Sequence, residues 1–221
     1  MKKMLIIFAC LGTLFWTCVV FRLTHILDYY SIPTTSNLPA FHPGDRVFAS
    51  RLKTPDYNNF ICFKLPDKKS TWTFRCIGKP GDIIEIKEAE VYRNGKLLDD
   101  SYTDNDYTIS HNQINRIEGY LKRNKTELEP LTDTLFRVTL SNKELKQYHL
   151  TLKKIISPKG QPNEDLFIDF KNKGYNEDNI GPVKVPADSY FALGDNRHGA
   201  FDSRYIGFIK KSEIVSTVLN H

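Results

Sequence analysis

The sequence lacks the features that mark nucleic-acid-binding proteins and repeat proteins. Its 31 Lys and Arg residues outnumber its 26 Asp and Glu residues by only five, and no dense basic stripe with interleaved aromatic residues is present. Because such a stripe is the usual footprint of nucleic-acid binding, we exclude nucleic acid as a partner. A weakly basic chain is better matched to the anionic headgroups of a lipid bilayer. Internal repeats and low-complexity tracts are absent as well.

Cysteine is scarce too, and neither a CxxC motif nor a cluster of histidines accompanies the four cysteines. We therefore expect no metal site and no cofactor. Cys10 and Cys18 lie in an apolar run, where packing or lipid contact accounts for them. Cys62 and Cys76 fall on two predicted strands that a short turn can pair. A disulfide in an oxidising compartment and two separate buried thiols are both compatible with that placement.

The N-terminal residues 4–21 carry no charge and follow Lys2 and Lys3. As a helix, this run is about 27 Å long, just enough to cross a hydrocarbon core. A cleaved signal peptide is the alternative, but the run is long and ends in Cys-Val-Val-Phe without a small-x-small site. We predict an uncleaved single-pass transmembrane helix over 4–21, with residues 1–3 cytoplasmic and the remaining chain exported.

After a juxtamembrane link over residues 22–31, the sequence favours β-strands. The strand segments are rich in β-branched and aromatic residues and are separated by turn signals. They comprise residues 46–52, 59–65, 71–77 and 82–93, and strands resume after residue 181. Asn94-Gly95 is the strongest turn signal and predicts a type I′ hairpin.

Residues 99–179 differ from their surroundings in being polar and weakly periodic. Ser141 and Glu144 form a capping box there, which predicts the start of a short helix. We predict an all-β fold class with an N-terminal transmembrane helix, a β core made of residues 32–98 and 180–221, and a polar inserted second domain over 99–179.

The segment IPTTSNLPAFHPGD, residues 32–45, has prolines at three positions, which favours a stiff, non-helical backbone. Ser36 is its natural nucleophile candidate. Thr34 lies two residues away, so an extended backbone places its hydroxyl on the same side. Ser and Thr between prolines are also common in ordinary loops, so this segment alone indicates little.

The segment GDNRHGAFDSRYIGF, residues 194–208, holds two carboxylates and two guanidiniums within ten residues. Asp195, Arg197, Asp202 and Arg204 at this spacing predict a tight loop braced by ion pairs. A solvated polar turn is the alternative.

Three motifs in order behind an apolar N-terminus resemble the bacterial type I signal peptidases, which are membrane-bound serine endopeptidases with a Ser/Lys dyad. The motifs are PxxSxxPxxxxGD, RCIGxPGD and GDNR…DSRY, and the similarity covers residues 32–82 and 180–209. The resemblance implies the family's β architecture, no cofactor, and a location in the bacterial cytoplasmic membrane with the β domain outside. It implies that exported precursors with small residues at positions −1 and −3 are the substrates, bound as an added strand.

The resemblance also assigns roles to residues. Ser36 matches the nucleophile, and Thr34 matches a hydroxyl that joins the Ser36 N–H in the oxyanion hole. Asp202 and Arg204 match the pair that braces the site, and Asp195 and Arg197 belong to the GDNR motif. It carries no expectation for the oligomeric state.

The sequence departs from the family where the general base should be. The family's lysine directly precedes the arginine of RCIGxPGD, and Phe74 occupies that position. Ala200 replaces a serine that often orients the lysine, and Asn37 replaces the usual methionine after the nucleophile. His42 and His198 are imidazoles near these motifs, although neither occupies the base position.

Two hypotheses about function follow. In the first, the chain is a signal peptidase that cleaves exported precursors after small-x-small sites, with a substitute base. In the second, it is a non-catalytic relative that binds exported segments without cleaving them. A purely structural exported protein would not need the complete set of motifs.

Overall fold

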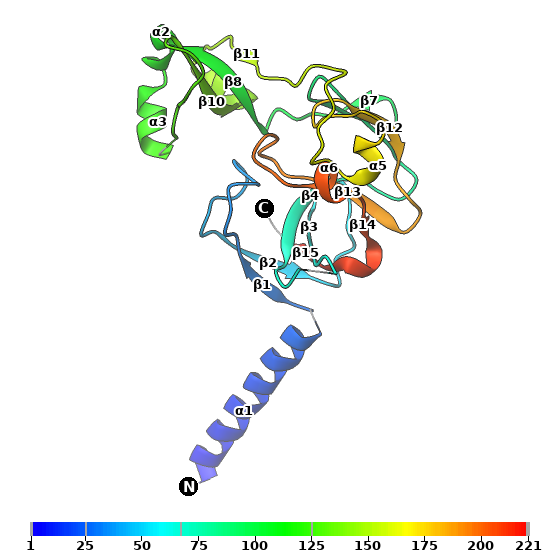
Figure 1. Ribbon diagram of the computed structural model, residues 1–221. Helices are drawn as coiled ribbons and strands as arrows, with labels where there is room; N and C mark the ends of the chain where they lie inside the picture. Colours follow the sequence, from blue (N-terminus) through cyan, green and yellow to red (C-terminus); the bar gives the residue numbers. More distant parts are fainter. Residues whose placement is uncertain (1, 25, 67, 125, 220–221) are drawn as a thin grey trace.

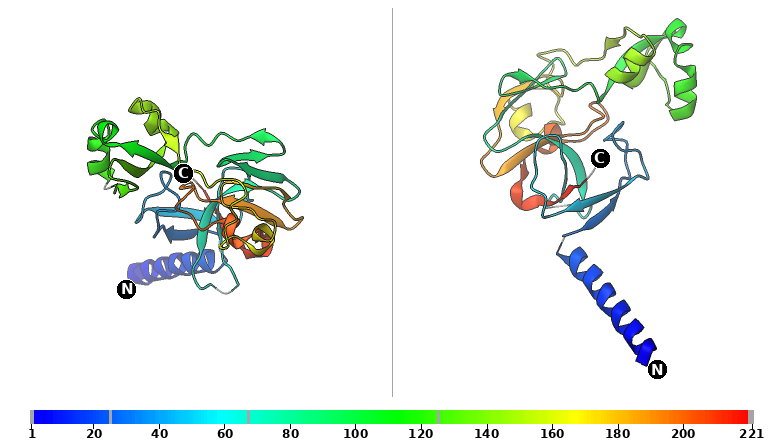
Figure 2. Two further views of the ribbon diagram at one scale, coloured as in Figure 1. Left: turned by 45° about the horizontal axis from the view of Figure 1, so that its top comes forward. Right: turned by 180° about the vertical axis from the view of Figure 1, so that it is seen from behind.

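In the computed structural model, a long helix stands apart from a β-rich body (Figures 1 and 2). The structure describes residues 2–24, 26–66, 68–124 and 126–219. Helix α1 spans Lys2–Leu23, and strand β1 (Asp28–Ser31) begins the body a few residues later. The β-rich body agrees with the predicted β fold class.

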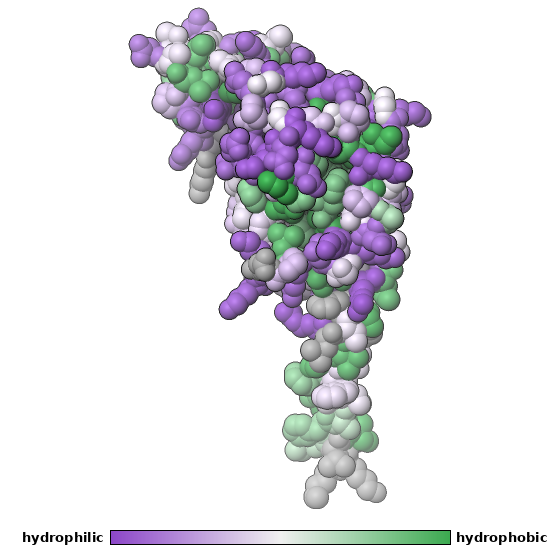
Figure 3. Space-filling model, turned by 45° about the vertical axis from the view of Figure 1, so that its right-hand side comes forward, coloured by the Kyte–Doolittle hydropathy of each residue, from purple (hydrophilic) through white to green (hydrophobic). Residues whose placement is uncertain are grey.

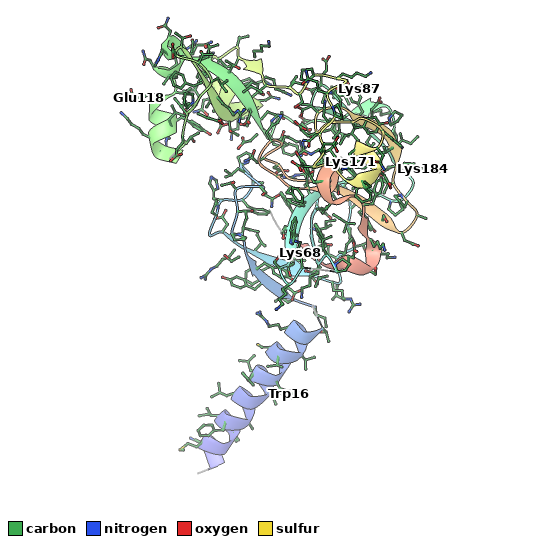
Figure 4. The ribbon with its side chains drawn as sticks, in the orientation of Figure 1. Trp16, Lys68, Lys87, Glu118, Lys171 and Lys184 are labelled. Carbon is green, nitrogen blue, oxygen red and sulfur yellow. The ribbon has the colours of Figure 1, made fainter. Side chains whose placement is uncertain are left out.

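Helix α1 exposes most of its apolar side chains. Phe15 and Trp16 are 69% and 67% exposed, and green apolar residues follow the helix in Figure 3. The labelled Trp16 side chain projects from the flank of the helix in Figure 4. Across the described parts of the chain, however, no helix combines the length and apolarity needed to cross a bilayer. The transmembrane span predicted over residues 4–21 is therefore not supported by the structure.

The largest sheet contains seven antiparallel strands in the order β1-β2-β15-β3-β4-β13-β14. Its other strands are β2 (Arg46–Ser50), β3 (Phe60–Phe63), β4 (Trp72–Gly78), β13 (Ser189–Leu193), β14 (Ile209–Lys210) and β15 (Ile214–Val218). Strands β3 and β13 are buried at every position. Their sequences, FICF and SYFAL, are accordingly short apolar runs instead of alternating patterns.

A four-stranded sheet of order β12-β5-β6-β7 shares a core with β4 and β13. Its strands are β5 (Ile83–Lys87), β6 (Glu90–Arg93), β7 (Lys96–Leu97) and β12 (Ile180–Lys184). The hairpin predicted at Asn94-Gly95 is confirmed, since both residues have positive φ, 52° and 76°. The single strand predicted over 82–93 is wrong. Glu88 and Ala89, at φ 50° and 61°, divide it into β5 and β6.

A separate four-stranded sheet of order β11-β8-β10-β9 lies within residues 104–154, and we term it the insert sheet. Its strands are β8 (Asp104–Ser110), β9 (Glu129–Pro130), β10 (Leu135–Ser141) and β11 (Lys153–Lys154), and its helices are α2 (His111–Ile114), α3 (Glu118–Asn124) and α4 (Asn142–Gln147). It has its own buried cluster, which includes Ile109 and Leu140. The predicted capping box begins α4, with the Ser141 hydroxyl accepting from the Glu144 N–H.

The chain after the insert sheet returns to the core. Leu166 and Phe170, the latter in α5 (Ile168–Lys171), pack in the same cluster as Ile77 of β4 and Phe191 of β13. Helix α6 (Ser203–Ile206) and the 3₁₀ turn η1 (Lys211–Glu213) complete the body. The insert sheet lies at the end of the molecule remote from α1 (Figure 1).

Both body cysteines are free thiols. Cys62 and Cys76 are fully buried, and on paired strands β3 and β4 the partner of Cys62 is Thr73. Burial raises the pKa of the Cys62 thiol to about 11 and that of Cys76 to about 12. Of the two possibilities that the sequence leaves open, the structure has the separate buried thiols.

Candidate active site

The segment that carries Ser36 is a compact turn held by the loop after β13. Within the turn, Leu38 N–H donates to Thr35 O and Phe41 N–H to Asn37 O, at 3.0 and 2.9 Å. From the loop, Asn196 N–H donates to the Ser36 carbonyl at 3.1 Å. The two motifs that are most distant in sequence therefore meet at Ser36.

The Ser36 hydroxyl is half-buried and has two polar neighbours among the described residues. It donates to the carbonyl oxygen of Gly199 at 3.3 Å, and it accepts from the exposed Thr34 hydroxyl at 3.4 Å. The structure thus brings together Ser36 and Thr34, the two hydroxyls singled out in the sequence. Neither neighbour can hold the proton that a nucleophilic serine must give up, since one is a hydroxyl and the other an amide carbonyl.

Phe74 is buried in an apolar cluster next to this turn. Its side chain is only 4% exposed, and its ring centroid lies 6.0 Å from that of Phe63 and 6.1 Å from that of Trp72. Ala200, 6% exposed, belongs to the same cluster. The two positions that the resemblance assigns to a general base and its orienting serine therefore form an aromatic–aliphatic contact.

Gly194 shows how closely these parts approach one another. A Cβ atom added to it would lie 2.4 Å from the Ala200 Cβ, 2.5 Å from the Ser36 carbonyl oxygen and 3.4 Å from the Phe74 ring. The first two distances are far below van der Waals contact, so only glycine fits here without displacing the turn. Ser36, Phe74 and Ala200 thus converge on one backbone position.

A groove of about 340 Å³ opens beside Ser36, and we term it the Ser36 groove. Its lining comes from the chain around residues 30–37, from residues 70–74 leading into and beginning β4, and from Phe201. Phe201 is 52% exposed, and its ring centroid lies 6.4 Å from that of Trp72. Its lining combines aromatic and aliphatic side chains with several hydroxyls, a mixture that suits a bound peptide segment.

Asn37 connects the two walls of this groove. It is 2% exposed, and its Nδ2 donates to the Thr73 carbonyl on β4 at 2.8 Å. The sequence singles out Asn37 only as a departure from methionine, and this contact of its amide is not evident from the motif.

Three buried ion pairs support the loop after β13. Asp202 pairs with Arg204, and its Oδ2 also accepts from the Gly194 N–H at 3.0 Å. Asp195, fully buried, accepts two hydrogen bonds from one edge of the Arg75 guanidinium, from Nε at 2.7 Å and from Nη2 at 2.5 Å. Of the ion pairs predicted within residues 194–208, the Asp202–Arg204 pair forms, whereas Asp195 pairs with a residue outside the segment.

Arg197 pairs outside the motif, with Asp100 at 3.0 Å. Sequence reasoning therefore missed Arg75 and Asp100 as partners of the loop. Arg75 belongs to the RCIGxPGD motif, and this membership could have marked it as a partner of the loop. Asp100 lies in the polar stretch after β7, where its sequence surroundings carry no signal.

The two candidate histidines are engaged elsewhere. His198 Nδ1 accepts from the Asp106 N–H at 3.3 Å, and its Nε2 lies 3.3 Å from Asp178 Oδ1. His42 is exposed and faces Asp45 at 3.9 Å. Neither imidazole contacts the Ser36 hydroxyl in the described chain. No group of three or more His, Cys, Asp or Glu side chains suited to a metal ion occurs among the residues that the structure describes.

Comparison with known proteins identifies the family. The family model for signal peptidase, peptidase S26, matches residues 2–220. The chain belongs to this family. The match includes α1, the turn of Ser36, the insert sheet and the loop after β13, so it is not confined to the three short motifs.

Curated relatives match most of this chain and about seven tenths of their own length. Signal peptidase I T of Bacillus subtilis (strain 168) is 26% identical over 199 residues, covering 87% of this chain and 72% of that protein. Signal peptidase I of Buchnera aphidicola subsp. Baizongia pistaciae is 26% identical over 229 residues, covering 89% and 69%. A crystal structure of a signal peptidase I from Enterococcus faecalis V583 is 24% identical, with a TM-score of 0.37, covering 76% of this chain and 98% of that one.

Proposed function

We propose that this S26-family chain acts on exported precursor proteins as a signal peptidase. The cleavage region of the precursor lies extended in the Ser36 groove. The Ser36 oxygen attacks the carbonyl carbon of the residue after which the chain is cut, and its proton passes to solvent water. The peptide C–N bond then breaks with protonation of the leaving amine from water, and a second water molecule hydrolyses the acyl-enzyme. The observation that carries this proposal is the half-buried Ser36 hydroxyl beside Thr34 in the lining of a groove. The curated signal peptidase I relatives favour cleavage over binding alone.

The oxyanion of the tetrahedral intermediate is assigned to the Ser36 N–H and the Thr34 hydroxyl. Both hydrogen-bond donors belong to the same turn, two residues apart. Donors that are fixed in place in this way stabilise the negative charge that develops in the transition state. Asp195, Arg197, Asp202 and Arg204 support this geometry through their ion pairs and do not touch the substrate.

Proton transfer is the slow part of this mechanism. Phe74 has no atom that accepts a proton, and the described contacts of the Ser36 hydroxyl provide no base. Loss of the base in a nucleophile–base unit slows serine proteases by on the order of 10⁶, or about 8 kcal/mol of barrier. We expect turnover by the native chain to be correspondingly slow.

One observation favours a second candidate function, binding without cleavage. Phe74 and Ala200 are both buried in one apolar cluster. The two side chains pack against apolar neighbours and leave, among the described residues around them, no polar pocket that would suit a lysine. A chain with this site would hold an exported segment in the groove and leave it intact.

Membrane attachment through α1 belongs to the same proposal. The exposed apolar side chains of α1 would be costly in water and favourable in lipid, and the β body would then lie on the outer side of the bacterial cytoplasmic membrane. Alkaline extraction of membranes tests the attachment, and protease treatment of spheroplasts tests the side. Extraction of the native chain with soluble proteins would contradict the proposal.

The experiment uses the full chain in detergent with a fluorescent peptide that contains an Ala-x-Ala junction. Cleavage and binding are followed for the native chain and for Ser36→Ala. Slow cleavage by the native chain that is lost in Ser36→Ala supports the peptidase. Binding with no cleavage supports the second candidate, and absence of both contradicts the groove as the substrate site.

A further inference from the structure

A cavity of about 460 Å³ lies between the turn after Ser36 and the helices of the insert sheet. The core contributes Pro39 and Arg75 to its lining, and α3 and α4 contribute Arg123 and Lys143. We term it the α3–α4 cavity. The elements around it are joined by direct hydrogen bonds, since Asp104 of β8 exchanges backbone hydrogen bonds with Asp195 and Arg197, each 2.9 Å long.

The cavity wall carries three cations and two carboxylates, so it is positive on balance. The Arg75 guanidinium is paired with Asp195, whereas the Glu144 carboxylate accepts from the neutral Ser141. Arg123 and Lys143, by contrast, are exposed and form no ion pair or side-chain hydrogen bond within the described chain. Among the described residues of its lining, the cavity therefore offers two unpaired cations, Arg123 and Lys143, against the single unpaired carboxylate of Glu144.

The remaining wall is aromatic. Tyr102, Tyr120 and Tyr148 line the cavity, and the rings of Tyr120 and Tyr148 meet edge to face with centroids 5.9 Å apart. Tyrosine provides a rigid contact surface with a polar end, which suits recognition of polypeptide. Free cations together with tyrosine select a chain that carries acidic side chains.

The cavity is within reach of a chain bound at Ser36. Pro39 is three residues from Ser36, so their Cα atoms are at most about 11 Å apart, which three to four extended residues span. Asn37 and Phe74 line the Ser36 groove, whereas their neighbours Pro39 and Arg75 line the cavity. A peptide that fills the groove before its cleavage point would pass Ser36 and continue toward the cavity.

We infer that the α3–α4 cavity binds an acidic stretch of the exported protein, located about three to five residues after the cleavage point. This inference rests on the proposed function, because it extends the peptide already placed in the groove. Helix α3, which contributes Arg123 to the lining, lies at the end of the molecule remote from α1, and this disfavours a lipid headgroup as the source of negative charge (Figure 1).

The test uses three labelled peptides and the full chain in detergent, with binding followed by fluorescence anisotropy. The first peptide has an Ala-x-Ala junction followed by Glu at the third to fifth positions. The second has Gln at these positions, and the third is the acidic stretch alone. We expect the first to bind about fivefold more tightly than the second, the amount that two exposed ion pairs supply, and the third to bind weakly.

Double substitution Arg123→Gln with Lys143→Gln should abolish the preference for Glu and the binding of the third peptide. The matched control is Lys122→Gln with Lys146→Gln, which removes the same charge from the same two helices at positions outside the cavity lining. Retention of the preference in the first double variant, or an equal loss in the control, would overturn the inference.

Failure of the Ser36 groove as the substrate site, on which the proposed function rests, gives a different result. In that case the Gln peptide does not bind at all, because it depends on the Ser36 groove. The third peptide does not use the groove, so its response to Arg123→Gln with Lys143→Gln still decides whether the cavity takes acidic polypeptide.

Discussion

The Nδ2 of Asn37 donates a 2.8 Å hydrogen bond to the carbonyl oxygen of Thr73. Asn37 directly follows the candidate nucleophile, and Thr73 directly precedes Phe74. One side-chain amide thus links the turn of Ser36 to strand β4, which carries Phe74. The candidate site is held together at this point.

Asn37→Ala is expected to destabilise the fold by about 1–3 kcal/mol, because it leaves the Thr73 carbonyl without its donor in a buried place. Urea denaturation followed by tryptophan fluorescence measures the change. Asn172→Ala removes an exposed amide at the end of α5 and serves as the control. An Asn37→Ala midpoint equal to that of the control would show that the bond contributes nothing to stability.

Phe74→Lys combined with Ala200→Ser is expected to raise peptide cleavage by several orders of magnitude, since it supplies the missing base and its orienting hydroxyl. Burial beside Phe63 and Trp72 would depress the pKa of the new lysine. Because only the neutral amine accepts a proton, the rate should rise with pH through that depressed pKa. Initial rates between pH 6 and pH 10 measure both effects.

The apolar substitution Phe74→Leu is the control for repacking around β4. An equal gain in Phe74→Leu would mean that relief of packing, and not a base, increased the rate. Circular dichroism of each variant establishes that the fold is retained.

Asp195→Ala should be among the most damaging single substitutions. It leaves the Arg75 guanidinium, itself 6% exposed, buried without its carboxylate, which costs about 3–5 kcal/mol in comparable cases. Asp56→Ala, which breaks the exposed pair with Lys79, should leave the urea midpoint nearly unchanged. Similar midpoints for the two variants would contradict a structural role for the buried pair.

Asp104 should make stability depend on pH. Burial, followed by the negative charges of Glu144, Asp195 and Asp106, raises the pKa of its carboxyl to about 7. The folded state then holds a proton that the unfolded chain loses near pH 4, so this residue makes stability fall as pH rises from about 4 to about 7. The total loss is at most about 4 kcal/mol.

The measurement compares native chain and Asp104→Asn by urea denaturation at several pH values. The variant should gain stability relative to the native chain as pH rises through this window and stay parallel to it above pH 8. Asp188→Asn, at an exposed position, should run parallel throughout. A constant difference between Asp104→Asn and the native chain would show that this carboxyl does not titrate in the window.

Local signals in the sequence located most of the strands and the capping box of α4, because alternation, turn residues and caps act over a few residues. The division of β5 from β6 was missed, since Glu88 and Ala89 carry no turn signal and adopt positive φ only in the tertiary context. Leu166 and Phe170 were assigned to the polar stretch 99–179, although their side chains pack in the β core. Such packing depends on long-range contacts that no local pattern encodes.

For the site, the motifs predicted that the segments of Ser36 and Asp195 belong together, and the hydrogen bond from Asn196 to Ser36 joins them. The partners of the charged residues were less predictable. Asp195 pairs with Arg75, which lies 120 residues away in the sequence. The contact of Asn37 with Thr73 depends on how the Ser36 turn packs against β4. Sequence motifs thus indicate which residues belong to a site, whereas the tertiary packing determines which of those residues form ion pairs and hydrogen bonds with one another.

The position of β15 constrains the order in which the protein can be assembled during synthesis. This strand, Ile214–Val218, lies between β2 and β3 in the seven-stranded sheet, yet the ribosome makes it some 150 residues after them. Until it emerges, β2 and β3 each present an open edge to the surroundings. The Ser36 site, which also needs the loop after β13, is therefore completed only in the final stage of synthesis or export, and a nascent chain released early would expose unpaired strands in place of a site.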